Sequence, residues 1–244
     1  MKPDPETSAI CTTSWDDGHP LDRRVADLLA KYGLTGTFYV PRDYFRPVMA
    51  TGEIRQLSRT FEVGAHTVHH AVLTEVPEEI AESEIRESKI WLEDITGSPC
   101  EIFCFPKGRY RRGHLEMVRR TGFRCVRTAE LLSTGFPVRR AGIHLIPTTV
   151  QAAPLHWTAY VRNCAKRLAA KNMIHFVRYA RSRNWTEAAR AMLRVVAENG
   201  GVFHLVGHSW EIEEQQQWPQ LESVFREMRQ LRSIAPCVPN SILA

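Results

Sequence analysis

The sequence predicts an α/β fold, a mostly parallel α/β barrel that forms one domain over residues 1–244. The main observation is that short runs rich in β-branched and aromatic residues alternate with segments of helical periodicity. The length of 244 residues also fits one such barrel, which typically has about 250 residues. We find no internal repeat and no Pro/Gly/Ser-rich linker that would divide the chain.

The strands are predicted from apolar runs that stop at turn-forming residues. The first run ends at Asp16-Asp17-Gly18, and the second, TGTFYV, ends at Pro41. We expect strands at residues 9–15, 35–40, 61–65, 101–105, 123–127, 143–150 and 201–206.

The helices are predicted from apolar residues at helical spacing, bounded by proline and glycine. Pro77 precedes the strongest of these patterns, and Gly97 follows its last turn. We expect helices at residues 21–32, near Arg55, and at 77–95, 114–120, 160–181, 186–198 and 221–231.

Composition excludes several classes of protein. With 43% hydrophobic and 24% charged residues, the chain is neither a disordered, a collagen-like nor a coiled-coil protein. The net charge of +5 is mild, and the chain has no helix-turn-helix, RNP or zinc-finger signature, so we expect no nucleic-acid partner. The six cysteines are scattered and read as reduced thiols. No apolar run is long enough for a transmembrane segment, and the polar N-terminus is not a signal peptide, so we expect a cytoplasmic protein.

The most reactive residue types follow predicted strands. Asp16 and Asp17 end the first strand, and a bound cation would relieve the repulsion between their carboxylates; a simple turn is the alternative. His66 and His70 follow the third strand at a spacing of four, which would put both rings on one face of a helical turn. A histidine-rich surface loop is the alternative for this segment. His208 follows the last predicted strand.

Because the carboxyl ends of parallel barrel strands lie at one edge, these side chains are expected to meet there. One aspartate oxygen and two histidine nitrogens make a three-ligand site with room for water. The ligand set suits one divalent metal ion, with zinc as the first expectation and iron, cobalt or nickel as alternatives.

Four segments resemble motifs of the polysaccharide deacetylase family (NodB homology, carbohydrate esterase family 4). Residues 14–18 (SWDDG) resemble its first motif, and residues 66–70 (HTVHH) resemble its second, H-[ST]-x-x-H. Residues 103–108 (FCFPKG) and 205–208 (LVGH) resemble the third and last motifs more loosely. The resemblance extends over most of the chain.

The resemblance implies a distorted, NodB-like (β/α) barrel of about seven strands. It also implies a metal-dependent hydrolase of carbon–nitrogen (non-peptide) bonds that removes an acetyl or formyl group from an amino sugar or sugar conjugate. In this assignment Asp17, His66 and His70 hold the metal, Asp16 is the general base toward metal-bound water, and His208 is the general acid.

The third motif departs from the family pattern. Cys104 and Lys107 stand where arginine and tyrosine often occur, so another residue must orient Asp16, and we expect Arg127 or Arg140. The backbone N–H of Lys107 could still bind an oxyanion.

Substrate binding is expected from residues near the motifs, namely Trp15, Pro106, Lys107 and Trp210. The two tryptophans could stack on a sugar ring, with a place in the core as the alternative. The ring of His208 is expected beside an apolar wall that disfavours its charged form.

Other interpretations stay open at this stage. The chain could hydrolyse a non-sugar linear or cyclic amide on the same fold, or could be an inactive carbohydrate-binding relative. The arginine-rich segment 162–194 is first interpreted as a solvated helix face. Contact with a phosphate-bearing substrate or an anionic membrane surface is the alternative.

Overall fold

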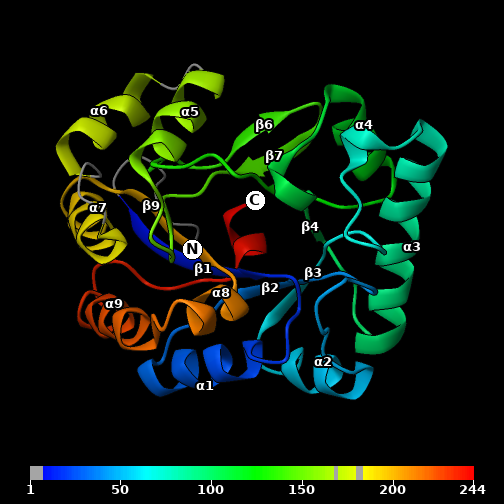
Figure 1. Cartoon of the computed structure of the whole chain (residues 1–244), viewed down its shortest axis with the longest axis horizontal. Helices are drawn as coiled ribbons and strands as arrows, with labels where there is room; N and C mark the ends of the chain where they lie inside the picture. The colour runs from blue at the N-terminus through cyan, green and yellow to red at the C-terminus, as the bar shows by residue number, and fades with distance from the viewer. Residues whose placement is uncertain (1–7, 168–169, 180–183) are drawn as a thin grey trace.

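The computed structural model describes residues 8–167, 170–179 and 184–244. Within these residues, nine strands form one curled sheet, a half-barrel with the order β6-β7-β5-β4-β3-β2-β1-β9-β8 (Figure 1). All neighbouring strands are parallel except β6 and β7. The strands are β1 (Ala9–Asp16), β2 (Thr37–Val40), β3 (Glu62–Ala65), β4 (Ile102–Cys104), β5 (Cys125–Arg127), β6 (Val138–Arg140), β7 (Ile143–Ile146), β8 (Val150–Gln151) and β9 (Gly201–Gly207).

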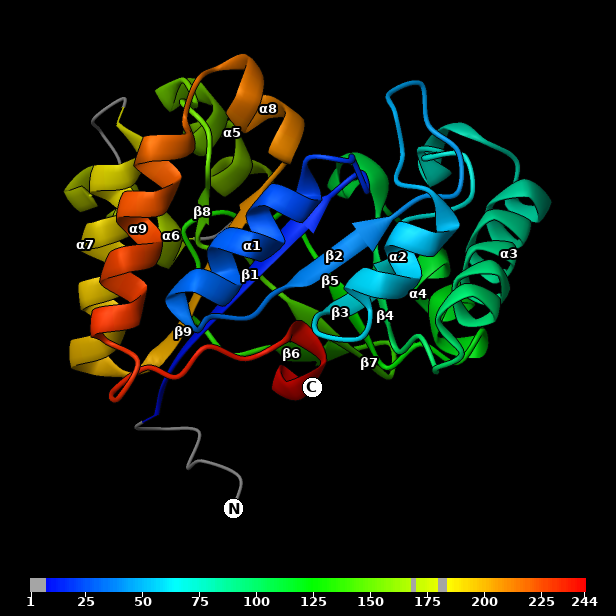
Figure 2. The same ribbon diagram turned by 90° about the horizontal axis from the view of Figure 1, so that it is seen from below.

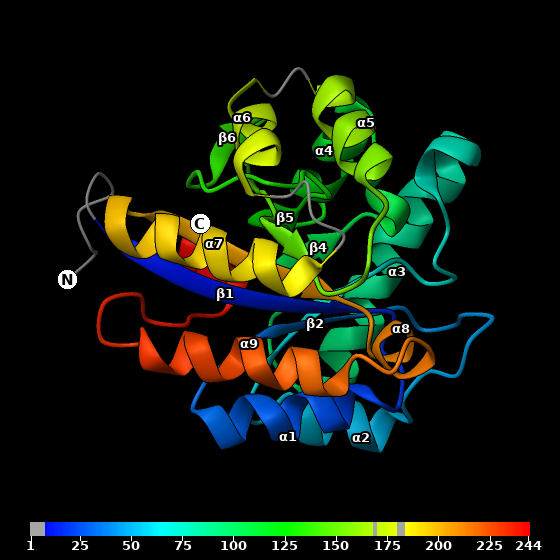
Figure 3. The same ribbon diagram turned by 60° about the vertical axis from the view of Figure 1, so that its left-hand side comes forward.

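Helices cover the outer face of this sheet, and α1 and α9 lie side by side along it (Figure 3). Each turns an apolar stripe inward because its hydrophobic residues recur at helical spacing. The Trp15 ring from β1 meets the Phe225 ring from α9 edge-on, with 6.1 Å between centroids. The described helices are α1 (Asp22–Tyr32), α2 (Thr51–Leu57), α3 (Glu78–Thr96), α4 (Arg112–Arg120), α5 (Trp157–Arg167), α6 (Ala170–Tyr179), α7 (Trp185–Asn199), α8 (Ser209–Glu214) and α9 (Trp218–Gln230).

The C-terminal segment lies at the amino ends of the central strands, opposite α8 (Figure 2). Its short 3-10 helix, Asn240–Leu243, is held by side chains of the sheet. Thr12 Oγ1 donates to Asn240 Oδ1 at 2.7 Å, and Asn240 Nδ2 donates to the Tyr39 hydroxyl at 2.9 Å. The segment therefore occupies one end of the half-barrel, and the carboxyl ends of the strands remain for the chemistry.

The predicted distorted α/β barrel is confirmed, with nine described strands where about seven were expected. The expected strand at 143–150 is interrupted at Pro147, which has no N–H to donate to a neighbouring strand. The helix expected at 160–181 is observed as α5 and α6, while residues 168–169 and 180–181 lie outside the described residues. The short helix α8 and the strand β6 were not expected. The division into a single domain stays a prediction.

No described helix combines the length and the apolar character that a membrane crossing requires. The cysteines form no disulfide among the described residues, and five of the six are buried. The N-terminal residues 1–7, from which the absence of a signal peptide was expected, lie outside the described residues.

Candidate metal and catalytic site

A cavity of about 290 Å³ lies at the carboxyl edge of the sheet. Strands β1, β3, β5 and β9 deliver polar side chains to it from positions that are far apart in the chain. Its wall contains all five residues expected to bind metal or act in catalysis: Asp16, Asp17, His66, His70 and His208. Parallel strands that end at one edge explain why residues separated by nearly two hundred positions meet here.

The turn after β1 aims Asp17 at the histidines. Asp17 has a φ of 78°, in the left-handed region that few non-glycine residues occupy. Gly18 follows with a φ of 60°, and a Cβ atom there would lie 2.6 Å from Val40 Cγ1. The Asp-Asp-Gly sequence is therefore both a turn and the support of a candidate ligand, so the two readings of this motif describe the same structure.

The loop that carries the histidines is not helical, which corrects the expectation of a helical turn. His66 directly follows β3, and both Thr67 and His70 have positive φ, at 65° and 51°. The buried carboxylate of Glu84 on α3 accepts hydrogen bonds from the backbone N–H groups of Val68 and His69 at 2.8 and 2.9 Å. The sequence spacing thus predicted that these two histidines lie together, and strained loop geometry, rather than a helical turn, brings them there.

Three ligand atoms converge in this loop region. Asp17 Oδ1 lies 3.2 Å from His70 Nε2 and 3.7 Å from His66 Nε2. The two imidazole rings are 4.8 Å apart between centroids at an angle of 69°. Asp17 Oδ1 is buried and has no hydrogen-bond partner among the described residues. A divalent cation would satisfy this atom, so the residues present fit a metal ion.

The protonation of His66 also suits a ligand. Its Nδ1 donates to the backbone oxygen of Cys104 at 2.8 Å, which leaves the lone pair on Nε2 directed to Asp17. Burial lowers the pKa of His66 to about 4, so the ring is neutral near pH 7. His69 differs, because its Nδ1 lies 2.6 Å from Glu84 Oε1. Its ring therefore stabilises the loop and is not one of the candidate ligands.

A second triad, Asp16 with His66 and Cys104, also brings ligand atoms close together. It is the weaker candidate for a metal ion for two reasons. Burial raises the pKa of the Cys104 thiol well above its ordinary value, so the sulfur keeps its proton. Asp16 is already engaged by a neighbouring cation.

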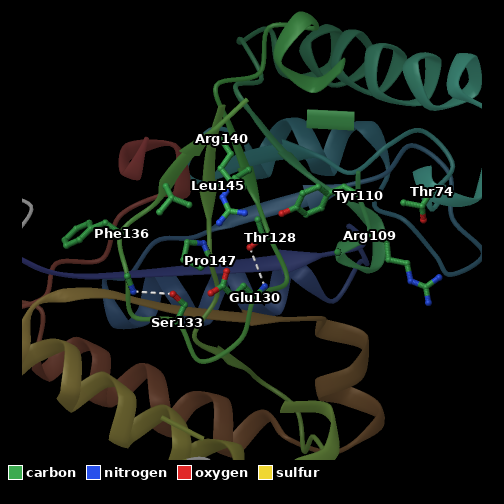
Figure 4. Close-up of a pocket in the computed structure, with 13 residues that line it drawn as sticks. Thr74, Arg109, Tyr110, Thr128, Glu130, Ser133, Phe136, Arg140, Leu145 and Pro147 are labelled. Atoms are coloured by element: carbon green, nitrogen blue, oxygen red, sulfur yellow. Dashed lines mark hydrogen bonds between the residues drawn. The ribbon is translucent and has the colours of Figure 1, made fainter. Parts of the chain in front are cut away.

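That cation is Arg127, at the end of β5. Its Nη2 donates a hydrogen bond to Asp16 Oδ2, and both side chains are buried. Burial alone would raise the pKa of Asp16, but the charge and hydrogen bond of Arg127, together with His66 and His208, outweigh burial and lower this pKa, so the carboxyl stays ionised. Of the two arginines expected to orient Asp16, Arg127 therefore does so. Arg140 lies exposed in β6, in the wall of a separate cavity of about 590 Å³ (Figure 4).

His208 faces Asp16, with 3.9 Å between its Nε2 and Asp16 Oδ2. Its Nδ1 lies 3.3 Å from Glu211 Oε2, in the first turn of α8. Burial alone would lower the pKa of His208, but the contact with Glu211 and the charges of Asp16 and Asp17 raise it to about 9. The expectation that its charged form is disfavoured is therefore wrong. Glu211 was missed by sequence reasoning, although its position three residues after His208 is a signal that could have been used.

Comparison with known families agrees with this geometry. The model of the family described as polysaccharide deacetylase matches residues 3–126. The chain belongs to the polysaccharide deacetylase family. Members of this family are metal-dependent carbohydrate deacetylases, which hydrolyse carbon–nitrogen bonds. No curated protein sequence matches the chain.

Three solved structures illustrate the shared deacetylase fold. A candidate polysaccharide deacetylase from Mycobacterium smegmatis is 15% identical with a TM-score of 0.67, over 97% of this chain and 89% of that one. The chitin deacetylase of the fungal pathogen Colletotrichum lindemuthianum is 14% identical with a TM-score of 0.63, over 98% and 89%. A peptidoglycan N-acetylglucosamine deacetylase, solved with an N-oxidanyl-benzamide compound, is 14% identical with a TM-score of 0.61, over 98% and 89%.

Of the residues expected to bind substrate, some lie in the cavity wall and some in the core. Lys107, at a φ of 54°, and Trp210 line the cavity. Pro106 is buried and does not line it. Trp15 is completely buried in the core, which corrects the expectation that its ring stacks on a sugar.

Tyr44, which sequence reasoning missed, also lines this cavity. Its ring lies 4.3 Å from that of His70 between centroids and covers this candidate ligand. The aromatic side chain comes from the loop between β2 and α2, where no motif marks it.

Proposed function

We propose that the protein removes an N-acyl group, acetyl or formyl, from an amino sugar or sugar conjugate. The observation that carries this proposal is the cluster of Asp17, His66 and His70 beside Asp16 and His208 in one cavity. Family membership supports hydrolysis of a carbon–nitrogen bond in a carbohydrate. The identity of the acyl group and of the sugar is part of the proposal.

Asp17, His66 and His70 are the residues that would hold one divalent ion, with zinc as the first choice. Such an ion lowers the pKa of a water molecule and polarises the acyl oxygen. Asp16 is ionised and buried beside the cluster, so it is suited to accept a proton from the attacking water. Arg127 orients the Asp16 carboxylate and keeps it from taking a proton at rest.

His208 has the opposite role in this proposal. Its raised pKa keeps Nε2 protonated near neutral pH, and this proton is available for the leaving nitrogen. As the carbon–nitrogen bond breaks, the nitrogen leaves as a free amine, and the acyl group leaves as a carboxylic acid that loses its proton to solvent and becomes a carboxylate. Asp16 returns the proton from water to solvent, and His208 regains one. The peptide N–H of Lys107, in the cavity wall, is the group proposed to bind the oxyanion.

The test is release of acetate or formate by the purified protein loaded with zinc. The substrates are N-acetyl and N-formyl amino sugars, with cyclic ureides included for comparison. We expect release from an amino sugar, loss of activity on chelation and recovery on adding metal. Asp17→Ala should abolish release, whereas Asp27→Ala, an exposed aspartate on α1, should not.

Turnover of the ureides with none of the amino sugars would overturn the substrate assignment. Metal-independent release would overturn the mechanism. Metal content measured on the Asp17→Ala and Asp27→Ala proteins checks that the loss of activity follows the loss of the ion.

A further inference from the structure

A second cavity, of about 500 Å³, adjoins the candidate site. The two cavities share six wall residues, so a ligand held in one can extend into the other. The shared residues are Lys107, Gly108, Ala129, Leu131, Gln151 and Asn163. We call this second space the basic cavity, because the charged side chains in its wall are cationic.

The charged residues in the wall of the basic cavity are Lys107, Arg109 and Arg162. None of the described residues in this wall has an acidic side chain. Arg109 is paired with Glu75. Lys107 and Arg162 have no ion-pair partner among the described residues, whereas surface arginines such as Arg124 are paired. Two cations are thus left uncompensated at the rim of the site.

The fold fixes the backbone positions of both residues. Lys107 lies in the left-handed turn after β4, at the boundary of the two cavities. Arg162 lies on α5, next to Asn163, whose side chain accepts from Leu131 N at 3.0 Å and donates to Ala129 O at 2.7 Å. These bonds attach α5 to the opposite wall, so the guanidinium group is presented from an anchored helix.

The acidic groups of the adjoining site do not neutralise these cations. Asp16 is paired with Arg127, and Asp17 accepts from Trp210 and faces the two histidines. Unpaired lysine and arginine in a concave wall favour a small anion, because charge-assisted hydrogen bonds to phosphate are strong and directional.

We propose that the basic cavity binds a phosphate group carried by the N-acylated substrate. The inference rests on the proposed function, since it places the amide in the catalytic cavity and the phosphate beside Lys107 and Arg162. The substrate class is then an N-acyl amino sugar bound to a phosphate or diphosphate ester. A nucleotide or a lipid diphosphate would supply the same chemistry.

The first experiment compares two substrates that differ in one group. The metal-loaded protein is given an N-acetylhexosamine as its 1-phosphate and as its methyl glycoside, and acetate release is measured. We expect KM for the phosphate ester to be at least tenfold lower. Arg162→Gln should raise that KM about tenfold, with kcat and the methyl glycoside unaffected. Arg226→Gln, an exposed arginine on α9 that lines no cavity described above, is the matched control.

The second experiment measures binding without turnover. Inorganic phosphate is titrated into the metal-loaded protein by calorimetry. We expect Kd to rise about tenfold in Arg162→Gln and in Lys107→Gln, and to be unchanged in Arg226→Gln. Phosphate bound through the metal alone would be insensitive to Arg162, and that result would overturn the inference.

The outcomes separate this inference from the proposed function. Equal KM values for the two hexosamines would overturn the phosphate site and leave deacetylation standing. Phosphate binding that depends on Arg162, without release of acetate or formate from any sugar, would support the phosphate site and overturn the proposed function. Nucleoside-diphosphate and polyprenyl-diphosphate esters of the same sugar then distinguish the two sources. Preference for either supports the inference, and preference for neither over the methyl glycoside overturns it.

Discussion

The indole Nε1 of Trp210 donates a hydrogen bond to Asp17 Oδ2 at 2.9 Å. The other carboxylate oxygen of Asp17 faces His66 and His70. The guanidinium group of Arg46 lies 3.6 Å from the centroid of the Trp210 ring. Trp210 therefore orients a candidate metal ligand, a role that differs from the sugar stacking considered from the sequence.

Replacement of Trp210 by phenylalanine should weaken metal binding. The variant keeps an aromatic ring but loses the donor to Asp17, so we expect metal affinity to fall roughly 10–100-fold. Competition with a chelating dye measures this affinity. Trp185→Phe loses an indole donor to Gln217 far from the cluster and is the control. Equal affinities in the two variants would show that the hydrogen bond does not orient the ligand.

The two neighbouring aspartates should respond differently to substitution. Asp17→Ala should lose the metal ion, whereas Asp16→Asn should retain it and lose turnover by about 10²–10⁴-fold. Metal analysis and steady-state kinetics on both variants test this assignment. If Asp16→Asn loses metal while Asp17→Ala keeps it, the assigned roles are reversed.

Asp16→Asn should also destabilise the fold, because it leaves the buried Arg127 without a counter-charge. Removing one partner of a buried ion pair typically costs about 3–5 kcal/mol. Chemical denaturation measures the free energy of unfolding. A double variant, Asp16→Asn with Arg127→Met, should regain part of the stability and none of the activity. If the double variant regains no stability, the unpaired charge of Arg127 is not the cause of the lost stability.

Glu211→Gln should shift the alkaline limit of activity. Glu211 helps to raise the pKa of His208 to about 9, so the wild-type general acid loses its proton only above that pH. Without the carboxylate charge this pKa falls, and kcat should decline at a lower pH than in the wild type. Glu213→Gln, an exposed neighbour on α8, should leave the profile unchanged. Coinciding profiles for Glu211→Gln and wild type would exclude this tuning.

Stability should fall on mild acidification because of His204. This ring is buried between Ser14 Oγ and the backbone oxygen of Pro147, and burial lowers its pKa to about 3. The unfolded chain binds a proton near pH 6.5, so His204 opposes folding progressively as pH falls from about 6.5 toward 3. The slope from this group is about 1.4 kcal/mol per pH unit.

Urea denaturation between pH 8 and pH 5, in chelator so that metal release does not contribute, measures this slope. His204→Asn should be less stable at pH 8 and show a shallower pH dependence, because the titrating ring is gone. Parallel slopes in the two proteins would assign the acid sensitivity to other groups.

The alternation of strands and helices, and the points where the strands end, could be predicted from the amino-acid sequence alone. Polar residues after β1, β3 and β9 had to meet, because parallel strands share a carboxyl edge. This rule, with the resemblance of two short motifs, was enough to select Asp17, His66 and His70. Local patterns carry this information because strand ends and turns depend on neighbouring residues.

The partners and the charge states of these residues depend on the three-dimensional fold. Arg127 pairs with Asp16 across 111 positions of sequence, and Trp210 bonds Asp17 across 193. The raised pKa of His208 results from three carboxylates that surround it, and the burial of Trp15 results from the packing of α9. Electrostatic and packing effects depend on distances between segments that are remote in the chain, and such distances exist only once the sheet has curled.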